Sequence, residues 1–237
     1  MTAFVALLIG LSKGGLGGLL GSLATPLMTL VMPANQVVGL LLPLLMFADL
    51  FAVLSYIKRW RLRLVLLLLP GGVAGVTMAT FFITHEPTRI LQITLGIIVL
   101  LFTIYKLIEK LILHILKYEG KDWHGLLAGT IAGFSSGLAH AGGPPVTIYL
   151  LLQKVTPIEF NATSVLFFTI LNWIKVPYYL YANLFDFKLL REIVWLMPII
   201  PFGVVIGRWA AGKINRLWFE RIIVVLLFIT GLMLILK

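Results

Sequence analysis

Two glycine-rich stretches carry the side chains best suited to bind a charged solute. The first, GLSKGGLGGLLGSLATP, runs from Gly10 to Pro26 and places Lys13 among the glycines. Glycines leave backbone N–H groups unpaired, and a half-helix that begins there would direct its positive dipole end at an anion. Alternatively, the glycines only pack helices and Lys13 extends to a nearby surface. The candidate ligands in this stretch are Ser12, Lys13, Gly14, Gly15, Gly17 and Gly18.

The second stretch, GFSSGLAHAGGPPVTIYLL, runs from Gly133 to Leu152. Its Gly-Gly-Pro-Pro run must interrupt a helix, and proline is well placed to begin the next one, which we expect over residues 146–152. That short helix would point its N-terminus at the same kind of pocket. His140 is either a ligand or an interior residue whose hydrogen bonds are satisfied. The candidate ligands here are Ser135, Ser136, His140, Gly142, Gly143 and Pro144.

Three further polar residues lie within apolar segments. Asp49 is in the middle of LLLPLLMFADLFAVLSYI, where a carboxylate is costly and usually faces a partner or a cavity. Lys13 is its obvious partner by charge. Asn172 and Lys175 stand three residues apart on one helix face and are candidate ligands, although Lys175 could instead extend towards the polar end of its segment. Asp49 and His140 are the candidates to carry a proton.

Composition indicates the solvent in which this chain folds. Apolar residues make up 60% of its 237 residues, charged residues only 12%, and its mean hydropathy is +1.06. A soluble domain has roughly a quarter charged residues, so we expect an all-α polytopic membrane protein. The net charge of +10 does not indicate nucleic-acid binding, because the basic residues lie in short loops between apolar segments. No cleavable signal peptide is evident, so we expect the first segment to be retained.

The sequence lacks the patterns of an enzyme or a metal protein. It has no cysteine, and its four histidines have no metal-ligand spacing. The GGLGG run is not followed by the GKS or GKT of a nucleotide site. An intramembrane protease could use only Ser135 or Ser136 with His140, and a membrane enzyme subunit or electron-transfer scaffold would need cofactor ligands. We therefore expect no enzyme, no cofactor and no metal.

Six apolar segments are long enough to cross a bilayer, whose hydrocarbon core requires about 20 helical residues. Two other segments, residues 1–32 and 125–152, are apolar but interrupted by glycine or proline. Such backbone exists at membrane depth only where protein buries it or where it lines a wet cavity. We expect both segments to be re-entrant hairpins. The expected spans cover residues 37–57, 64–83, 90–108, 160–182, 193–212 and 219–236.

The two halves of the chain resemble each other, since polar and glycine positions recur at one offset. We therefore predict a first repeat over residues 1–108, a cytoplasmic linker over 109–124 and a second repeat over 125–237. The corresponding positions include Gly10 and Gly133, Asp49 and Asn172 and, after an insertion of eight residues in the second half, Gly72 and Gly203.

Positive charge predicts the orientation of these repeats. The loop at 58–63 and the linker are both basic and two spans apart, so we expect both in the cytoplasm and residues 84–89 outside. In the second half, the loop around Arg216 is more basic than the loop around Asp186. Placing the Arg216 loop inside inverts the second half, provided that each interrupted segment is re-entrant, which is a recurrent transporter plan. The alternative is eight transmembrane helices with parallel halves.

Both glycine-rich stretches also resemble a known family. The runs GLSKGGLGGLLGSLATPL and GFSSGLAHAGGPPVTIYLL are similar to the two signature regions of the sulfite exporter TauE/SafE family, and the resemblance extends over nearly the whole chain. It implies a permease of the bacterial inner membrane that exports sulfite, sulfoacetate or a related small anion. Lys13–Gly18 and His140–Pro145 would then form the substrate site. The lipid bilayer and a second copy of the chain are the other expected partners.

The residues favour a transporter in which two half-helix N-termini, one from each repeat, hold an oxyanion near the midplane. Lys13, His140 and Lys175 would assist, and with Asp49 negative the embedded charge is +1. Export of an anion from a negative-inside cell is favourable by about 2.3 kcal/mol per charge per 100 mV, so a coupling ion is not required. The alternative is a proton- or cation-coupled carrier of another small solute, centred on Asp49.

Overall fold

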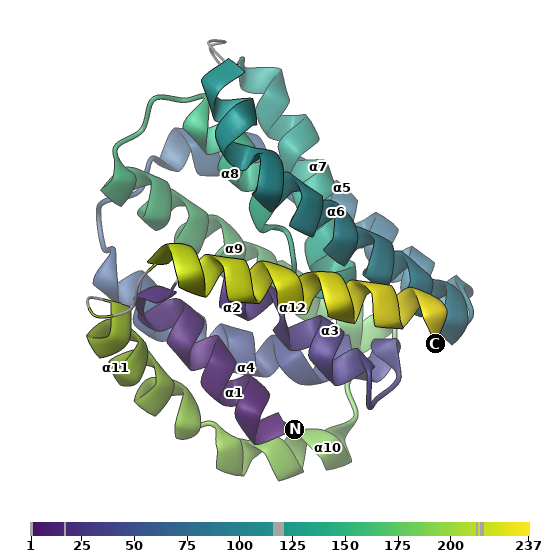
Figure 1. Cartoon of the computed structure of the whole chain (residues 1–237). Coiled ribbons are helices and arrows are strands. Elements are labelled where there is room, and N and C mark those ends of the chain that lie inside the picture. The colour runs from purple at the N-terminus through teal and green to yellow at the C-terminus, as the bar shows by residue number, and fades with distance from the viewer. Residues whose placement is uncertain (1, 17, 116–120, 212, 214–215) are drawn as a thin grey trace.

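The computed structural model describes the whole chain except residues 1, 17, 116–120, 212 and 214–215 (Figure 1). The described residues form helices and no strand. In the first half these are α1 (Thr2–Leu11), the π-helical turn η1 (Ser12–Leu16), α2 (Gly18–Ser22), α3 (Ala24–Thr29), α4 (Ala34–Ser55), α5 (Leu62–His85) and α6 (Thr88–Ile115). In the second half they are α7 (Asp122–Ala139), α8 (Gly143–Leu151), α9 (Pro157–Tyr181), α10 (Phe187–Ile193), the 3-10 turn η2 (Val194–Leu196), α11 (Ile199–Ala211) and α12 (Arg216–Leu236).

Four helices of the described chain are long and apolar enough to cross a membrane. They are α4, α5, α12 and residues 88–109 of α6. Large apolar side chains such as Leu54, Leu107 and Phe81 are well exposed on the outside of the molecule, which suits contact with lipid rather than with water. The chain is therefore a multi-pass helical membrane protein, as its composition predicts.

One expected span needs correction, and another is more polar than the rest. Residues 193–212 are not one straight helix, because α10 and η2 lead into α11 with a bend of 46°. Pro198 lies at this junction and has no N–H with which to continue a helix. The span expected over 160–182 corresponds to α9, which is 25 residues long but is not among the four apolar helices. One of its faces carries polar residues that are described with the site below.

One end of the molecule gathers the beginnings of α5, α7 and α9, and we call it the Arg61 end. Arg61 pairs with Glu159 at 2.7 Å, and its backbone N–H donates to Thr163 Oγ1 at 3.0 Å. Arg63 pairs with Asp122 at 2.7 Å. These contacts hold the first residues of α5, α7 and α9 side by side at the same end of the molecule, where the basic loop at 58–63 also lies.

The opposite end, which we call the Arg89 end, gathers the beginning of α6 and the end of α12. Arg89 donates to the carbonyl oxygens of Leu234 and Ile235 at 3.2 and 2.5 Å. Lys237 donates to Leu30 O, just after α3, at 2.8 Å. The helix end marked C in Figure 1 therefore lies beside the last residues of α3 and the first residues of α6.

Each interrupted segment folds back on itself. α8 returns along α7, because a Cβ built on Gly125 would lie 3.0 Å from the ring of Tyr149, so this pair opens at the Arg61 end. α3 returns along α1, since Val5 and Met28 share one buried cluster. This second pair opens at the Arg89 end, where Leu30 follows α3. The two hairpins thus enter the molecule from opposite ends.

Glycines let each hairpin approach one long helix of the other half of the chain. A Cβ on Gly133 of α7 would lie 2.2 Å from Gly72 O and 3.0 Å from Gly72 Cα in α5. A Cβ on Gly10 of α1 would lie 2.4 Å from Ile200 O and 2.9 Å from Gly203 Cα in α11. No side chain fits between backbones at such distances. In Figure 1, α11 accordingly lies along the rim of the molecule against α1, and α5 lies beside α7.

Candidate functional site

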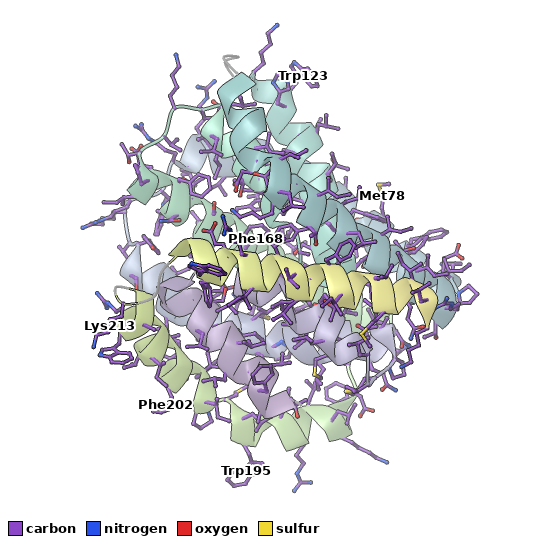
Figure 2. The ribbon with its side chains drawn as sticks, viewed as in Figure 1. Met78, Trp123, Phe168, Trp195, Phe202 and Lys213 are labelled. Atoms are coloured by element: carbon purple, nitrogen blue, oxygen red, sulfur yellow. The ribbon has the colours of Figure 1, made fainter. Side chains whose placement is uncertain are left out.

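A cavity of about 420 Å³ lies between the first hairpin, α4, α6, α8 and α9. It occupies the centre of the molecule, where Phe168 of its wall is labelled in Figure 2. A space of this volume is large enough for a small solute. This cavity is therefore the candidate solute site.

The cavity follows one face of α9 from the Arg61 end to the middle of the molecule. Asn161, Ser164, Phe168 and Asn172 all line it, and their spacing of three or four residues places them on one helix face. From Asn161 to Asn172 the helix rises about 16 Å at 1.5 Å per residue. The cavity thus has an outer part near the Arg61 end and a deep part at about half the thickness of a bilayer.

Lys13 brings a positive charge to the deep part. Its Nζ forms an ion pair with Asp49 Oδ1, and Asn172 Nδ2 donates to Asp49 Oδ2 at 2.7 Å. The Asp49 side chain is only 1% exposed, whereas that of Lys13 is 22% exposed and lines the cavity. The expected pairing of Asp49 with Lys13 is therefore confirmed. The carboxylate lies on the side of the ammonium that faces away from the cavity.

Lys175 is enclosed by acceptors instead of facing the cavity. Its side chain has no exposed area, and Nζ donates to Ser136 Oγ at 2.7 Å and to Asn172 Oδ1 at 3.1 Å. His140 Nδ1 lies 3.3 Å away. An ammonium has three N–H donors, so all three are engaged. Lys175 thus joins α9 to the second hairpin, and the polar chain continues through Asn172 to Asp49 and the first hairpin.

His140 has its hydrogen bonds satisfied and also lines the cavity. Its Nε2 lies 3.0 Å from Val38 O, and since a carbonyl oxygen only accepts, Nε2 must donate and Nδ1 must accept from Lys175. The residue ends α7 with a φ of 51°, a left-handed conformation in which histidine is enriched among non-glycine residues. The structure therefore supports the interpretation of His140 as an interior residue whose hydrogen bonds are satisfied, and its role as a ligand stays a prediction.

The N-terminus of α8 faces the cavity with two available amides. The helix begins at Gly143 and not at Val146 as expected, with Pro144 and Pro145 in its first turn. The first N–H groups of a helix have no intrahelical acceptor, and prolines have no N–H at all. Gly142 and Gly143, which both line the cavity, are therefore the donors at this helix end.

Some of the residues predicted for the site line the cavity, and others do not. The hydroxyl of Ser135 donates to Ile131 O of its own helix at 2.8 Å, and a Cβ on Gly14 would lie 2.3 Å from Val204 O of α11. Gly17 lies outside the described residues. Gly15 belongs to η1, and Gly18 begins α2. The predicted residues that line the cavity are Ser12, Lys13, Ser136, His140, Gly142, Gly143, Pro144 and Asn172.

The half-helix N-terminus expected in the first glycine-rich stretch stays a prediction, because Gly17, between η1 and α2, lies outside the described residues. η1 continues α1 as a π-helical turn, and the following α2 has only five residues. Two glycines of this stretch, Gly10 and Gly14, pack against α11. Lys13 thus belongs to a helical turn, η1. Among the described residues, the N-terminus of α8 lines the cavity.

Sequence reasoning missed a polar group on α6. Tyr105, Lys106 and Glu109 line the cavity, yet none of the three was among the residues predicted for the site. The helix extends to Ile115, beyond its apolar span over Thr88–Glu109, so it continues into the predicted linker over 109–124. The recurrence of Phe102, Lys106 and Glu109 at helical spacing was the available signal.

Helices that suit a bilayer and enclose a polar central cavity define a membrane transport protein. The family model for the sulfite exporter TauE/SafE family matches residues 2–234, so the chain belongs to this family, whose members are membrane transporters and not enzymes. A relative from Cupriavidus necator, named "Probable sulfite/organosulfonate exporter TauE", is 21% identical over 141 residues. The match covers 60% of this chain and 54% of that relative. No solved structure matches the chain.

Proposed function

We propose that this protein exports a small oxyanion, sulfite or an organosulfonate such as sulfoacetate, across the bacterial inner membrane. The observation that carries the proposal is the deep part of the cavity. There the Lys13 ammonium, the Ser136 hydroxyl and the N-terminus of α8 all face one space. Because Ser136 Oγ accepts from Lys175, its own proton remains available for a substrate oxygen. Donors from three directions suit a group with three oxygens.

The arrangement around Asp49 favours an anion over a cation as the transported solute. Both carboxylate oxygens are already engaged, one by Lys13 and one by Asn172. A cation would have to displace an ammonium to reach this carboxylate, whereas an anion can approach the exposed side of that ammonium directly. A carrier centred on Asp49 remains the alternative function. Proton or cation dependence of transport that disappears in Asp49→Asn would support that alternative.

Flux measurements test the proposed function. Proteoliposomes containing the purified protein should carry sulfite or sulfoacetate in a panel that also includes thiosulfate, sulfate and acetate. Lys13→Ala should lower that flux about tenfold or more, because it removes a charge-assisted hydrogen bond to the substrate. Lys188→Ala, which removes an exposed lysine far from the cavity, should leave flux intact. Unchanged flux in Lys13→Ala, with equal protein in the vesicles, would contradict the assigned role.

We further infer that the two halves form inverted repeats, each with three spans and one re-entrant hairpin. Under the predicted correspondence, Gly10 and Gly203 of one contact become Gly133 and Gly72 of the other, and both contacts occur. A two-fold relation exchanges contacts in this way. It also brings equivalent residues on its axis together, and Asp49 and Asn172 are hydrogen-bonded. These exchanges support the inverted repeat over eight parallel crossings.

Cysteine labelling tests this topology, since the native chain has no cysteine. The Arg61 end is expected in the cytoplasm, because basic loops stay inside. Single cysteines at Arg59 and Lys213 should therefore react only when a membrane-impermeant maleimide reaches the cytoplasmic face. Cysteines at Thr88 and Lys188 should react in intact spheroplasts. Labelling of Arg59→Cys and Lys213→Cys from opposite sides would contradict the inverted arrangement.

A further inference from the structure

The polar group on α6 lies on the one face of that helix that looks into the protein. Phe102, Tyr105, Lys106 and Glu109 line the cavity, and their spacing places them on one side of the helix. Large apolar neighbours of these residues, namely Leu101, Ile104, Leu107 and Ile108, are exposed on the outside of the molecule. A lysine that only extends to the membrane surface would not be confined to the inner face, so a role inside the cavity is indicated.

Lys106 and Glu109 form a closed polar unit in this wall. Lys106 Nζ pairs with Glu109 Oε2, and Tyr105 OH donates to Glu109 Oε1 at 3.2 Å. The two charged side chains are only 17% and 18% exposed. Removing two charges from water is costly, and their mutual attraction often offsets that cost only in part, so a role beyond pairing with each other is indicated.

The cavity therefore contains two lysine–carboxylate pairs at two depths. Asp49 lies behind the cavity wall, whereas Glu109 itself lines the cavity beside Lys106. In the deep part, Lys13 faces the space and Asp49 holds its ammonium; in the wall formed by α6, Lys106 faces the space and Glu109 holds its ammonium. The two lysines are similarly shielded, with 22% and 17% of their side chains exposed. α6 ends towards the linker and begins at the Arg89 end, so its residues 105–109 lie in the outer part of the cavity.

We propose that Lys106 and Glu109 form an outer anion-docking subsite, at which an oxyanion replaces Glu109 as the partner of Lys106 before it reaches Lys13. This inference rests on the proposed function, since it assumes that the cargo is an anion. Glu109 neutralises Lys106 while the subsite is empty, so the empty cavity does not retain stray anions. An anion that binds in its place is held weakly enough to move on, because the carboxylate competes to return.

The subsite should govern apparent affinity and leave turnover largely unchanged. In everted membrane vesicles, whose outer face is the cytoplasmic one, Lys106→Gln should raise the KM for sulfite about three- to tenfold with kcat retained. Glu109→Gln should lower the KM by a similar factor, because it leaves Lys106 without a competing carboxylate. Lys58→Gln is the matched control, since it removes the same charge from the same end but outside the cavity. It should leave KM within twofold.

Opposite effects of the two variants separate docking from a structural role. If the ion pair only braces α6, Lys106→Gln and Glu109→Gln break the same contact and should shift KM and thermal stability in the same direction, which would overturn the inference. An equal KM rise in Lys106→Gln and Lys58→Gln would also overturn it, because general surface charge would then explain the effect. In both cases wild-type sulfite flux leaves the proposed function standing. Absence of wild-type flux for every anion would remove both.

Discussion

Asp49→Ala is expected to destabilise the folded protein by about 3–5 kcal/mol and to abolish transport, because it leaves a lysine ammonium without its buried counter-charge. Asp49 is 1% exposed and accepts from both Lys13 and Asn172. Its loss therefore strands two donors in the middle of the membrane. Thermal unfolding of the purified protein in detergent, read beside proteoliposome flux, measures both effects.

The matched control is Asp122→Ala, which also breaks a lone aspartate ion pair. The side chains of Asp122 and Arg63 are 55% and 75% exposed, so this substitution should cost about 0–1 kcal/mol. A double variant, Lys13→Met with Asp49→Leu, removes both charges and should recover at least half of the stability that Asp49→Ala loses, but no transport. Equal losses in Asp49→Ala and Asp122→Ala would contradict the structural role of the buried pair.

Gly71→Ala is the second substitution for which we expect a large effect, and its sign is informative. In an isolated helix this change stabilises by about 1 kcal/mol, because alanine is the better helix former. Here the added Cβ would lie 2.0 Å from Leu126 O and 2.7 Å from Thr130 N, both backbone atoms of α7. No side-chain rotation relieves such contacts, so α5 and α7 must separate. We expect a destabilisation of at least about 1–3 kcal/mol, typical of overpacked interiors.

Gly143→Ala provides the control for the same chemical change. A Cβ at Gly143 meets nothing within 4 Å, so the melting temperature should stay close to that of the wild type. Transport could still change in this variant, because Gly143 lines the cavity; for this reason the comparison is made on stability alone. A melting temperature of Gly71→Ala equal to that of Gly143→Ala would show that the close approach of α5 and α7 is not required.

Several features of the site were predictable because they depend on residue type within a short window. Asp49 is a carboxylate in an apolar run, so a partner had to exist, and Lys13 was the obvious cation. The Gly-Gly-Pro-Pro run had to break a helix, and α7 does end at Ala139, with α8 beginning at Gly143. The start of α9 at Pro157, where Thr156 and Glu159 cap each other's backbone N–H groups, precedes the expected start at residue 160.

Other features required contacts between distant segments. Lys175 has a helical neighbour in Asn172, but its other acceptors, Ser136 and His140, come from the second hairpin. Helical periodicity predicts which residues share one face of a helix, but it does not predict which other helix packs against that face. For the same reason Gly14 was assigned to the ligand set, whereas its lack of a side chain serves close packing against α11.

The sequence by itself determined that this protein folds in a bilayer. It also determined at which residues the helices are interrupted and which few polar residues must be buried. These follow from local hydrophobicity and from the backbone geometry of glycine and proline. Only the tertiary structure decided that Lys13 faces the cavity while Lys175 is enclosed, and that Lys106 belongs to the cavity wall. The direction in which a charged side chain points is set by the helices packed around it, and those helices come from both halves of the chain.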